Sequence, residues 1–124
     1  MHLTYRINYG YVIYDIVGNI PYEESEILEE YVKDNFPQDY KNAIFNMEKV
    51  PYINSSALSV FIKILKFLEA KGIKVYMMNV NEEIYGLLKL TGVHKFFKYI
   101  KDEKMLVERQ KRMELDSFLN EEPL

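Results

Sequence analysis

The sequence predicts an α/β domain: a mainly parallel sheet of four to five strands, with an N-terminal β-hairpin and about four surrounding helices. The first observation is that short apolar segments rich in β-branched and aromatic residues alternate with segments of helical period. The second is their order, β-β-α-β-α-β-α-β-α, which requires parallel strands joined by right-handed crossovers. The third is length, since 124 residues suffice for one domain with a substantial core.

The N-terminal segment predicts the hairpin and then the first helix. Residues 5–9 alternate apolar and polar side chains, residues 11–17 are mostly β-branched or aromatic, and a glycine separates the two runs. A turn at Gly18-Asn19 follows, and Pro21 then suits the first turn of a helix. The apolar side chains that give this helix its period are Ile27, Leu28, Tyr31 and Val32.

The rest of the chain alternates strands and helices. The expected strands cover residues 43–47, 73–78 and 96–100, and the expected helices cover residues 55–71, 81–90 and 102–112 or beyond. Gly72 suits the left-handed position that ends many helices, whereas Asn81 and Asp102 suit helix N-caps. The tail, residues 120–123, is expected to fray. We therefore expect one domain over residues 1–112 and a C-terminal helix extension and tail over residues 113–124.

Composition excludes several classes of function. The net charge of −3 and the pI near 5.4 argue against nucleic-acid binding, which usually needs a basic face. The absence of cysteine removes disulfides, thiolate metal sites and cysteine nucleophiles, and it fits a reducing compartment. The N-terminus is too polar for a signal peptide, and no apolar run approaches the ~20 residues of a membrane span. We expect a cytoplasmic protein without membrane or nucleic-acid partners.

The usual catalytic, cofactor and metal motifs are missing from the sequence. Neither common glycine-rich phosphate loop occurs, and no nucleophile elbow supports a Ser-His-Asp triad. His2 and His94 lie far apart and suit ordinary surface or boundary positions. A phosphoacceptor receiver domain would need acidic residues where Asn46 and Asn54 stand. We expect no enzyme, no cofactor and no metal, although a deep pocket lined by convergent polar groups would favour an enzyme.

The segment Ile53-Asn54-Ser55-Ser56-Ala57-Leu58 opens the long helix and holds the strongest candidate site. Asn54 or Ser55 can cap this helix, because their side-chain oxygens accept hydrogen bonds from free backbone N–H groups. A phosphate on Ser55 would meet the same N–H groups and the positive end of the helix dipole, and it would add nearly two negative charges. The residues alone leave both interpretations open, a cap only or a cap beside a modification site.

The long helix has a wider apolar arc than one sheet face needs. At about 100° per residue the arc covers roughly 220°, whereas covering a sheet needs somewhat more than ~100°. Its members are Ala57, Leu58, Val60, Phe61, Ile62, Ile64, Leu65, Phe67 and Leu68. Either a neighbouring helix or a partner protein must bury the excess. The margins of the arc, Val60, Ile62 and Phe67, are therefore the candidate partner-binding residues.

Three stretches of the chain together resemble the STAS domain of anti-sigma-factor antagonists. Residues 46–58, NMEKVPYINSSAL, resemble its signature: a strand ending in Asp-Leu-Ser, a short loop with an apolar pair, and Asp-Ser-Ser-Gly-Leu opening a helix. Residues 71–75, KGIKV, resemble its helix–glycine–strand junction. Residues 83–97 resemble its hydrophobic helix, Thr/Ser-Gly-Leu and short final strand. The resemblance covers about residues 4–112 in order and spacing, and it implies a STAS-like fold.

What the resemblance implies is regulation through protein–protein contact. Members of the family bind an anti-sigma factor that is also a serine kinase. The kinase phosphorylates the first serine of Asp-Ser-Ser, binding is lost, and a phosphatase restores it. By resemblance that serine is Ser55, with Ser56 as the second choice. The alternative function is a non-phosphorylated STAS scaffold that assembles into a larger signalling complex, in which Ile62 and Phe67 matter and Ser55 does not.

The sequence differs from the family pattern around this site. Asn54 replaces the acid before the serines, Asn46 replaces the aspartate at the strand end, and Ala57 replaces glycine. Residues 18–21, Gly-Asn-Ile-Pro, fall where many members have Gly-Glu-Leu-Asp. We therefore treat Asn19, Asn46, Asn54 and Ala57 as the residues that flank the site. We do not expect a STAS domain of an anion transporter, because the sequence predicts no membrane span. The oligomeric state is left open.

Overall fold

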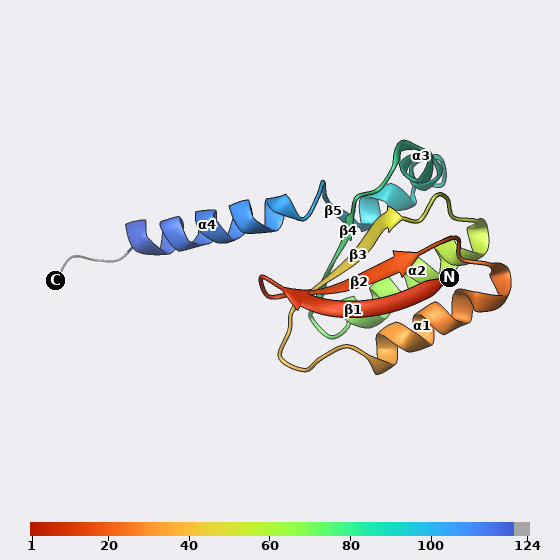
Figure 1. Cartoon of the computed structure of the whole chain (residues 1–124), viewed down its shortest axis with the longest axis horizontal. Helices are drawn as coiled ribbons and strands as arrows, with labels where there is room; N and C mark the ends of the chain where they lie inside the picture. The colour runs from red at the N-terminus through yellow and green to blue at the C-terminus, as the bar shows by residue number, and fades with distance from the viewer. Residues whose placement is uncertain (121–124) are drawn as a thin grey trace.

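The computed structural model describes residues 1–120, in which a five-stranded sheet has helices on both faces (Figure 1). The strands lie in the order β1-β2-β3-β4-β5, with β1 antiparallel to β2 and every later pair parallel. Their bounds are β1 His2–Asn8, β2 Tyr11–Val17, β3 Asn42–Lys49, β4 Lys74–Met78 and β5 Lys98–Ile100. The predicted fold, a mainly parallel α/β sheet with an N-terminal hairpin, is thus confirmed.

A two-residue turn joins β1 to β2. Tyr9 and Gly10 form this turn between the paired residues Asn8 and Tyr11, and both have left-handed backbone angles, with φ of 50° and 80°. Two left-handed residues in succession match the twist of the flanking strands, which is why they make the tightest hairpins. Gly10 adopts this conformation freely, whereas Tyr9 pays a steric penalty for its side chain.

The main core lies between one face of the sheet and the helices α1 (Ser25–Asp34), α2 (Ser55–Glu69) and α3 (Glu82–Leu90). Alternate residues of the central strands point into it, because successive side chains of a strand face opposite sides. The strand residues concerned are Val12, Tyr14, Ile16, Ala43, Phe45, Met47, Val75 and Met77. Phe45 and Phe61 of α2 meet edge to face with ring centres 5.3 Å apart, which fixes α2 over the middle of the sheet.

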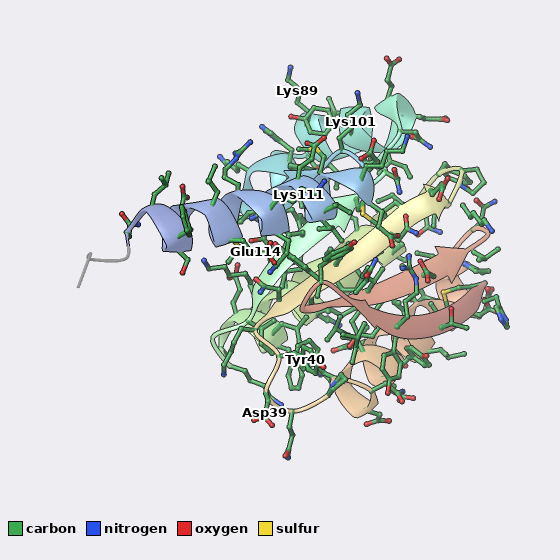
Figure 2. All side chains as sticks on the ribbon, turned by 60° about the vertical axis from the view of Figure 1, so that its left-hand side comes forward. Asp39, Tyr40, Lys89, Lys101, Lys111 and Glu114 are labelled. Carbon is green, nitrogen blue, oxygen red and sulfur yellow. The ribbon has the colours of Figure 1, made fainter. Side chains whose placement is uncertain are left out.

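The opposite face of the sheet carries a smaller apolar cluster: Tyr11, Ile13, Ile44, Tyr76, Met78, Ile100 and Leu106. Leu106 belongs to α4 (Lys104–Leu119) and is fully buried, so the start of this helix covers the face. The Arg109 guanidinium lies 5.8 Å from the Tyr11 ring centre and 5.1 Å from that of Tyr76. Residues 111–120 are all exposed, and α4 extends away from the sheet (Figures 1 and 2).

Most predicted boundaries agree with the structure. The first strand spans His2–Asn8 rather than residues 5–9, because Tyr9 belongs to the turn. The starts of two later elements also need correction. The first helix begins at Ser25 rather than directly after Pro21, because Tyr22–Glu24 form a 3₁₀ turn whose backbone bonds run between closer residues. The last strand begins at Lys98 rather than Phe96, because Val93–Phe96 form a second 3₁₀ turn.

The predicted helix ends are also found. Gly72 follows α2 with a φ of 77°, and the Asn81 side chain accepts the Ile84 N–H at 2.8 Å. Asp102 accepts the Met105 N–H at 3.3 Å at the start of α4. The expected fraying concerned residues 120–123: Asn120 is the C-cap of α4, and residues 121–123 lie outside the described residues. The proposed limit at residue 112 falls within α4.

Candidate functional site

Ser55 is the first residue of α2, and its side chain is exposed to solvent. The preceding Asn54 caps the helix: its Oδ1 accepts the Ala57 N–H at 2.9 Å, and its carbonyl accepts the Leu58 N–H at 3.1 Å. The Asn54 amide also donates to the Ile20 carbonyl at 3.4 Å, which ties the start of α2 to the loop after β2. Since Asn54 does the capping, the Ser55 hydroxyl is left available at the surface.

A groove of about 400 Å³ lies beside this serine pair, between the start of α1 and the first turns of α2. Its lining residues are Tyr22, Glu23, Ser25, Glu26, Ser56, Ser59, Val60 and Lys63. Ser56 forms part of the wall, whereas Ser55 precedes it at the helix end. A phosphate on either serine would place new negative charge beside Glu23 and Glu26, so it would change the electrostatic potential of the groove.

The three candidate partner-binding residues lie in different surroundings. Val60 is buried and lines the groove, while Ile62 and Phe67 are partly buried against the core. The Phe67 ring centre lies 5.1 Å from Nζ of Lys33, which belongs to α1, and 4.4 Å from Nζ of Lys71. The neighbouring helix α1 therefore covers part of the wide apolar arc of α2. Ile62 and Phe67 retain some exposed surface at its margins.

The four flanking residues are not all brought to the serines. Asn19 is exposed in the loop whose next residue, Ile20, accepts the bond from Asn54, and Ala57 is fully buried within α2. Asn46 instead contributes to the opposite face of the sheet. Its amide donates to Asp15 at 2.8 Å, and its Oδ1 accepts from Asn79 at 2.9 Å.

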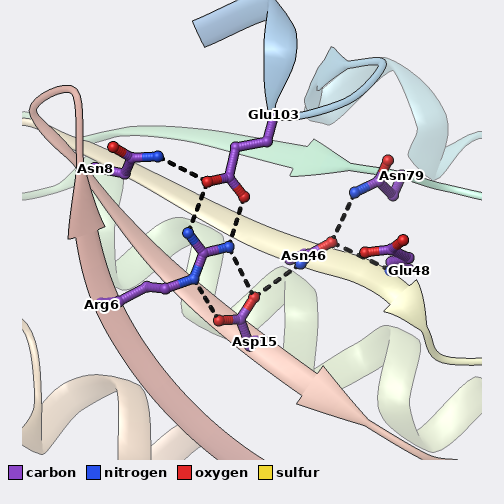
Figure 3. Close-up of polar contacts among 7 residues, drawn as sticks. All are labelled: Arg6, Asn8, Asp15, Asn46, Glu48, Asn79 and Glu103. Carbon is purple, nitrogen blue, oxygen red and sulfur yellow. Dashed lines mark hydrogen bonds and ion pairs between the residues drawn. The ribbon is translucent and has the colours of Figure 1, made fainter. Parts of the chain in front are cut away.

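This second face holds a connected polar cluster that runs across β1, β2 and β3 and includes Glu103 before α4 (Figure 3). Its centre is Arg6 of β1, which bonds to Asp15 of β2 at 2.7 Å through Nε and to Glu103 at 2.8 Å and 2.6 Å through its two terminal nitrogens. The Asn8 amide donates to Glu103 as well, at 2.7 Å. Glu103 immediately precedes α4, so the cluster ties that helix to the hairpin.

The two charged partners stabilise each other's ionised form. The hydrogen bonds from Arg6 hold the pKa of Glu103 below its ordinary value, with a smaller contribution from Asn8. Hydrogen bonds to Glu103 and Asp15 raise the pKa of Arg6 further above its already high ordinary value. A bidentate arginine–carboxylate pair also fixes orientation, because two parallel bonds allow one geometry. The cluster therefore sets where α4 begins.

Sequence reasoning missed this cluster except for Asn46. A signal was present, because Asp15 and Asn46 interrupt two otherwise apolar strands at the positions where their carboxyl ends meet. Glu103 gave no comparable signal. It lies 97 positions from Arg6, in a segment whose only local role is to lead into a helix.

Another cleft, of about 470 Å³, is lined mainly by apolar and aromatic side chains. They are Met77, Val80, Tyr85, Tyr99, Ile100, Lys101 and Met105. Burial raises the pKa of Tyr99 to about 12, and its hydroxyl already donates to the His94 carbonyl at 2.7 Å. This lining suits apolar contact rather than proton transfer.

Among residues 1–120, no group of three or more acidic or histidine side chains is placed to hold a metal ion. None of the helices formed by these residues is both long and apolar enough to span a bilayer.

The described residues thus form a small α/β domain that presents two serines at the start of a helix, the second of them in the wall of a groove. The STAS domain profile matches residues 2–105, and the chain belongs to the STAS domain family. No protein of curated function matches the sequence.

Several solved structures share this fold. A protein of Thermotoga maritima described as a candidate anti-sigma factor antagonist has 24% identity and a TM-score of 0.73, covering 88% of this chain and 94% of its own. A sulfate transporter family protein of Wolinella succinogenes has 19% identity and a TM-score of 0.72, covering 87% and 90%. The anti-sigma factor antagonist SpoIIAA of Bacillus, unphosphorylated, has 14% identity and a TM-score of 0.71, covering 89% and 96%.

Proposed function

We propose that this protein is an anti-sigma-factor antagonist, a non-catalytic regulator that captures an anti-sigma factor with serine kinase activity. Phosphorylation of Ser55 by that kinase releases the complex, and a phosphatase restores binding. The observation that carries the proposal is the position of Ser55: it is exposed at the start of α2, where Asn54 caps the helix, and the next residue, Ser56, lines a groove between two helices.

The physical basis of the switch is charge at a helix end. A phosphoserine carries nearly two negative charges near neutral pH, and the N-terminus of α2 stabilises anions through its amides and dipole. The modified domain would keep its fold, because the phosphate lies in solvent. A partner in contact with the groove would meet the added charge beside Glu23 and Glu26. Binding would therefore be lost through repulsion and desolvation rather than through unfolding.

Two of the structural neighbours are the two phosphorylation states of one anti-sigma factor antagonist. SpoIIAA has been solved in unphosphorylated and phosphorylated forms, with TM-scores to this chain of 0.71 and 0.65. At 14% identity these likenesses concern the fold. The assignment of Ser55 rests on its place at the start of α2.

The decisive experiment is intact-mass analysis of the protein purified from its native cell, followed by phosphopeptide mapping of residues 54–58. We expect the mass of one added phosphate on Ser55, absent from Ser55→Ala and present in the matched Ser56→Ala variant. Ser55→Asp should weaken the capture of the cognate serine kinase in a pull-down, while the matched control Ser117→Asp, at an exposed position of α4, should leave it unchanged.

Loss of phosphate from both single variants would indicate a different site. An unmodified protein under all growth conditions, with capture of the kinase reduced by Ile62→Lys or Phe67→Ala and unaffected by Ser55→Asp, would favour the constitutive scaffold instead. Both surface variants change residues that are only partly buried, so circular dichroism should show a retained fold.

A further inference from the structure

The outer edge of β1 is a long, unprotected strand edge. Within residues 1–120, β1 pairs with β2 alone, and it spans seven residues against three for β5 at the other edge of the sheet. Proteins usually protect such edges with proline, bulges or exposed charge. The segment HLTYRIN contains no proline and only one permanent charge, Arg6, which is already bonded to Asp15 and Glu103. The register of β1 with β2 is continuous, so no bulge protects this edge.

The hairpin turn determines which backbone groups face outward. In a hairpin with a two-residue turn, the residues flanking the turn form a hydrogen-bonded pair, here Asn8 and Tyr11. Bonded and non-bonded pairs alternate along antiparallel strands. Every second residue back from Asn8 therefore bonds to β2, and the residues between them direct N–H and C=O groups away from the sheet. Those outward residues are Leu3, Tyr5 and Ile7.

The same three residues form an apolar row beside the edge. Their cross-strand partners, Ile16, Tyr14 and Val12, belong to the main core, so Leu3, Tyr5 and Ile7 share the face that α1 covers. The cover is incomplete: Tyr5 is 41% exposed and Ile7 is 45% exposed. Free backbone groups and an exposed apolar row thus coincide on one strand.

We propose that β1 pairs antiparallel with β1 of a second copy of this chain, which joins two sheets across a two-fold axis at Tyr5. In this register Tyr5 lies opposite Tyr5 of the second copy, and Leu3 lies opposite Ile7. The outward groups of the two strands then make about six backbone hydrogen bonds. An isologous contact of this kind closes on itself, so it gives a dimer and not a fibre.

The side chains of β1 favour pairing with a second copy of the chain, and they favour the Tyr5-centred register. On the other face of the sheet, Thr4 meets Arg6 of the second copy and His2 meets Asn8, so no two like charges face each other. A shift of the two strands that centres the axis on Arg6 would place two arginines directly opposite, which is destabilising. A shift the other way, centred on Thr4, shortens the pairing and sets His2 opposite Arg6. Only the Tyr5-centred register matches aromatic with aromatic, apolar with apolar and polar with polar.

Sedimentation velocity of the full chain, from micromolar to millimolar concentration, tests the proposal. A short strand pair is a small interface, so we expect a monomer–dimer equilibrium that depends on concentration. Ile7→Lys replaces the apolar contact with Leu3 of the second copy by a charge beside an apolar side chain, and it should raise the dimer dissociation constant at least about tenfold. Leu90→Lys is the matched control on α3, where Leu90 is 85% exposed, and should leave the constant unchanged. A wild-type protein that stays monomeric over this range would overturn the proposal.

Cross-linking provides a test that does not depend on how Ile7→Lys folds. The chain has no cysteine, so one introduced cysteine reports a single position. Thr4 is exposed, and in the proposed register the two Thr4 residues are diagonal neighbours roughly 7–8 Å apart. Thr4→Cys should give a covalent dimer with a short bis-maleimide, and Leu90→Cys should not. Equal cross-linking of both variants would contradict the assigned edge. Ser55→Asp should leave the dimer intact, which separates this proposal from the function proposed for Ser55.

Discussion

Arg6 connects three parts of the molecule that are far apart in the sequence. It reaches from β1 to Asp15 on β2 and to Glu103 before α4, with partly exposed side chains throughout. An exposed ion pair contributes little by itself, but a bidentate pair within a network contributes more and fixes geometry. The role of Glu103 is therefore to position α4 as much as to stabilise the fold.

Replacing Glu103 should reveal this role through pH. Glu103→Gln loses the ion pair with Arg6 and should reduce the free energy of unfolding by about 1 kcal/mol at neutral pH. Because folding lowers the pKa of Glu103 from its ordinary value of 4.5, its stabilising contribution is present above that value and is lost as the pH falls below it. The two proteins should thus differ in thermal unfolding at pH 7 and converge in acid. A difference that persists unchanged in acid would contradict the assignment.

At the residue scale, the sequence indicates a polar side chain more readily than it indicates its partner. A cap at Asn54 or Ser55 was predicted, and Asn54 provides it, because capping depends on residues within one turn. Asn46 was placed near the serines by resemblance, whereas its bonds run to Asp15 and Asn79 across the sheet. Such contacts depend on which strands become neighbours, and no local pattern contains that information.

Among the elements, α2 has the clearest dependence on a single side chain. Asn54→Ala removes the acceptor for the Ala57 N–H and should lower the free energy of unfolding by about 1 kcal/mol. Asn54→Asp keeps an equally good cap and adds a charge that the helix dipole favours, so stability should be retained or slightly raised. Urea unfolding of the three proteins measures both effects. Equal losses in both variants would mean that the bond from the Asn54 amide to Ile20 matters more than the cap.

The corrected starts of the two later elements have a common physical origin. Tyr22–Glu24 and Val93–Phe96 are 3₁₀ turns, which share the residue types of a helix start or a strand start. At the first of these, the Ser25 hydroxyl donates to the Tyr22 carbonyl at 2.8 Å and completes the turn before α1 begins. The periodicity of apolar residues predicted that these elements exist. It did not predict where each begins, because a single turn is too short to show a period.

At the scale of the whole molecule, the fold followed from the order of the elements, because alternating strands and helices allow few topologies. What the sequence did not reveal is the unequal cover of the two faces. One face is buried beneath α1, α2 and α3, whereas the other depends on one side chain of α4, Leu106, and on Arg109 lying over Tyr11 and Tyr76.

Two changes in α4 should therefore differ strongly in their effect on the free energy of unfolding. Leu106→Ala leaves a cavity over the second face and should reduce the free energy of unfolding by about 2–4 kcal/mol. Ending the chain after Arg112, at the proposed domain limit, removes only exposed residues among those described and should change it by less than about 0.5 kcal/mol. Thermal melts followed by circular dichroism distinguish the two. A large loss on truncation would show that residues 113–124 belong to the domain.

Because α4 is anchored at one end, a small rotation at that end moves the other end much further. Residues 111–119 of the helix extend about 14 Å beyond the last half-buried residue, at ~1.5 Å per residue. A rotation of only ~10° about the Glu103–Arg6 anchor would displace the helix tip by roughly 4 Å over the full ~24 Å of α4. A contact that loosens Arg6 on the sheet would thus displace the far end of α4 further than its start, where Leu106 packs on the sheet.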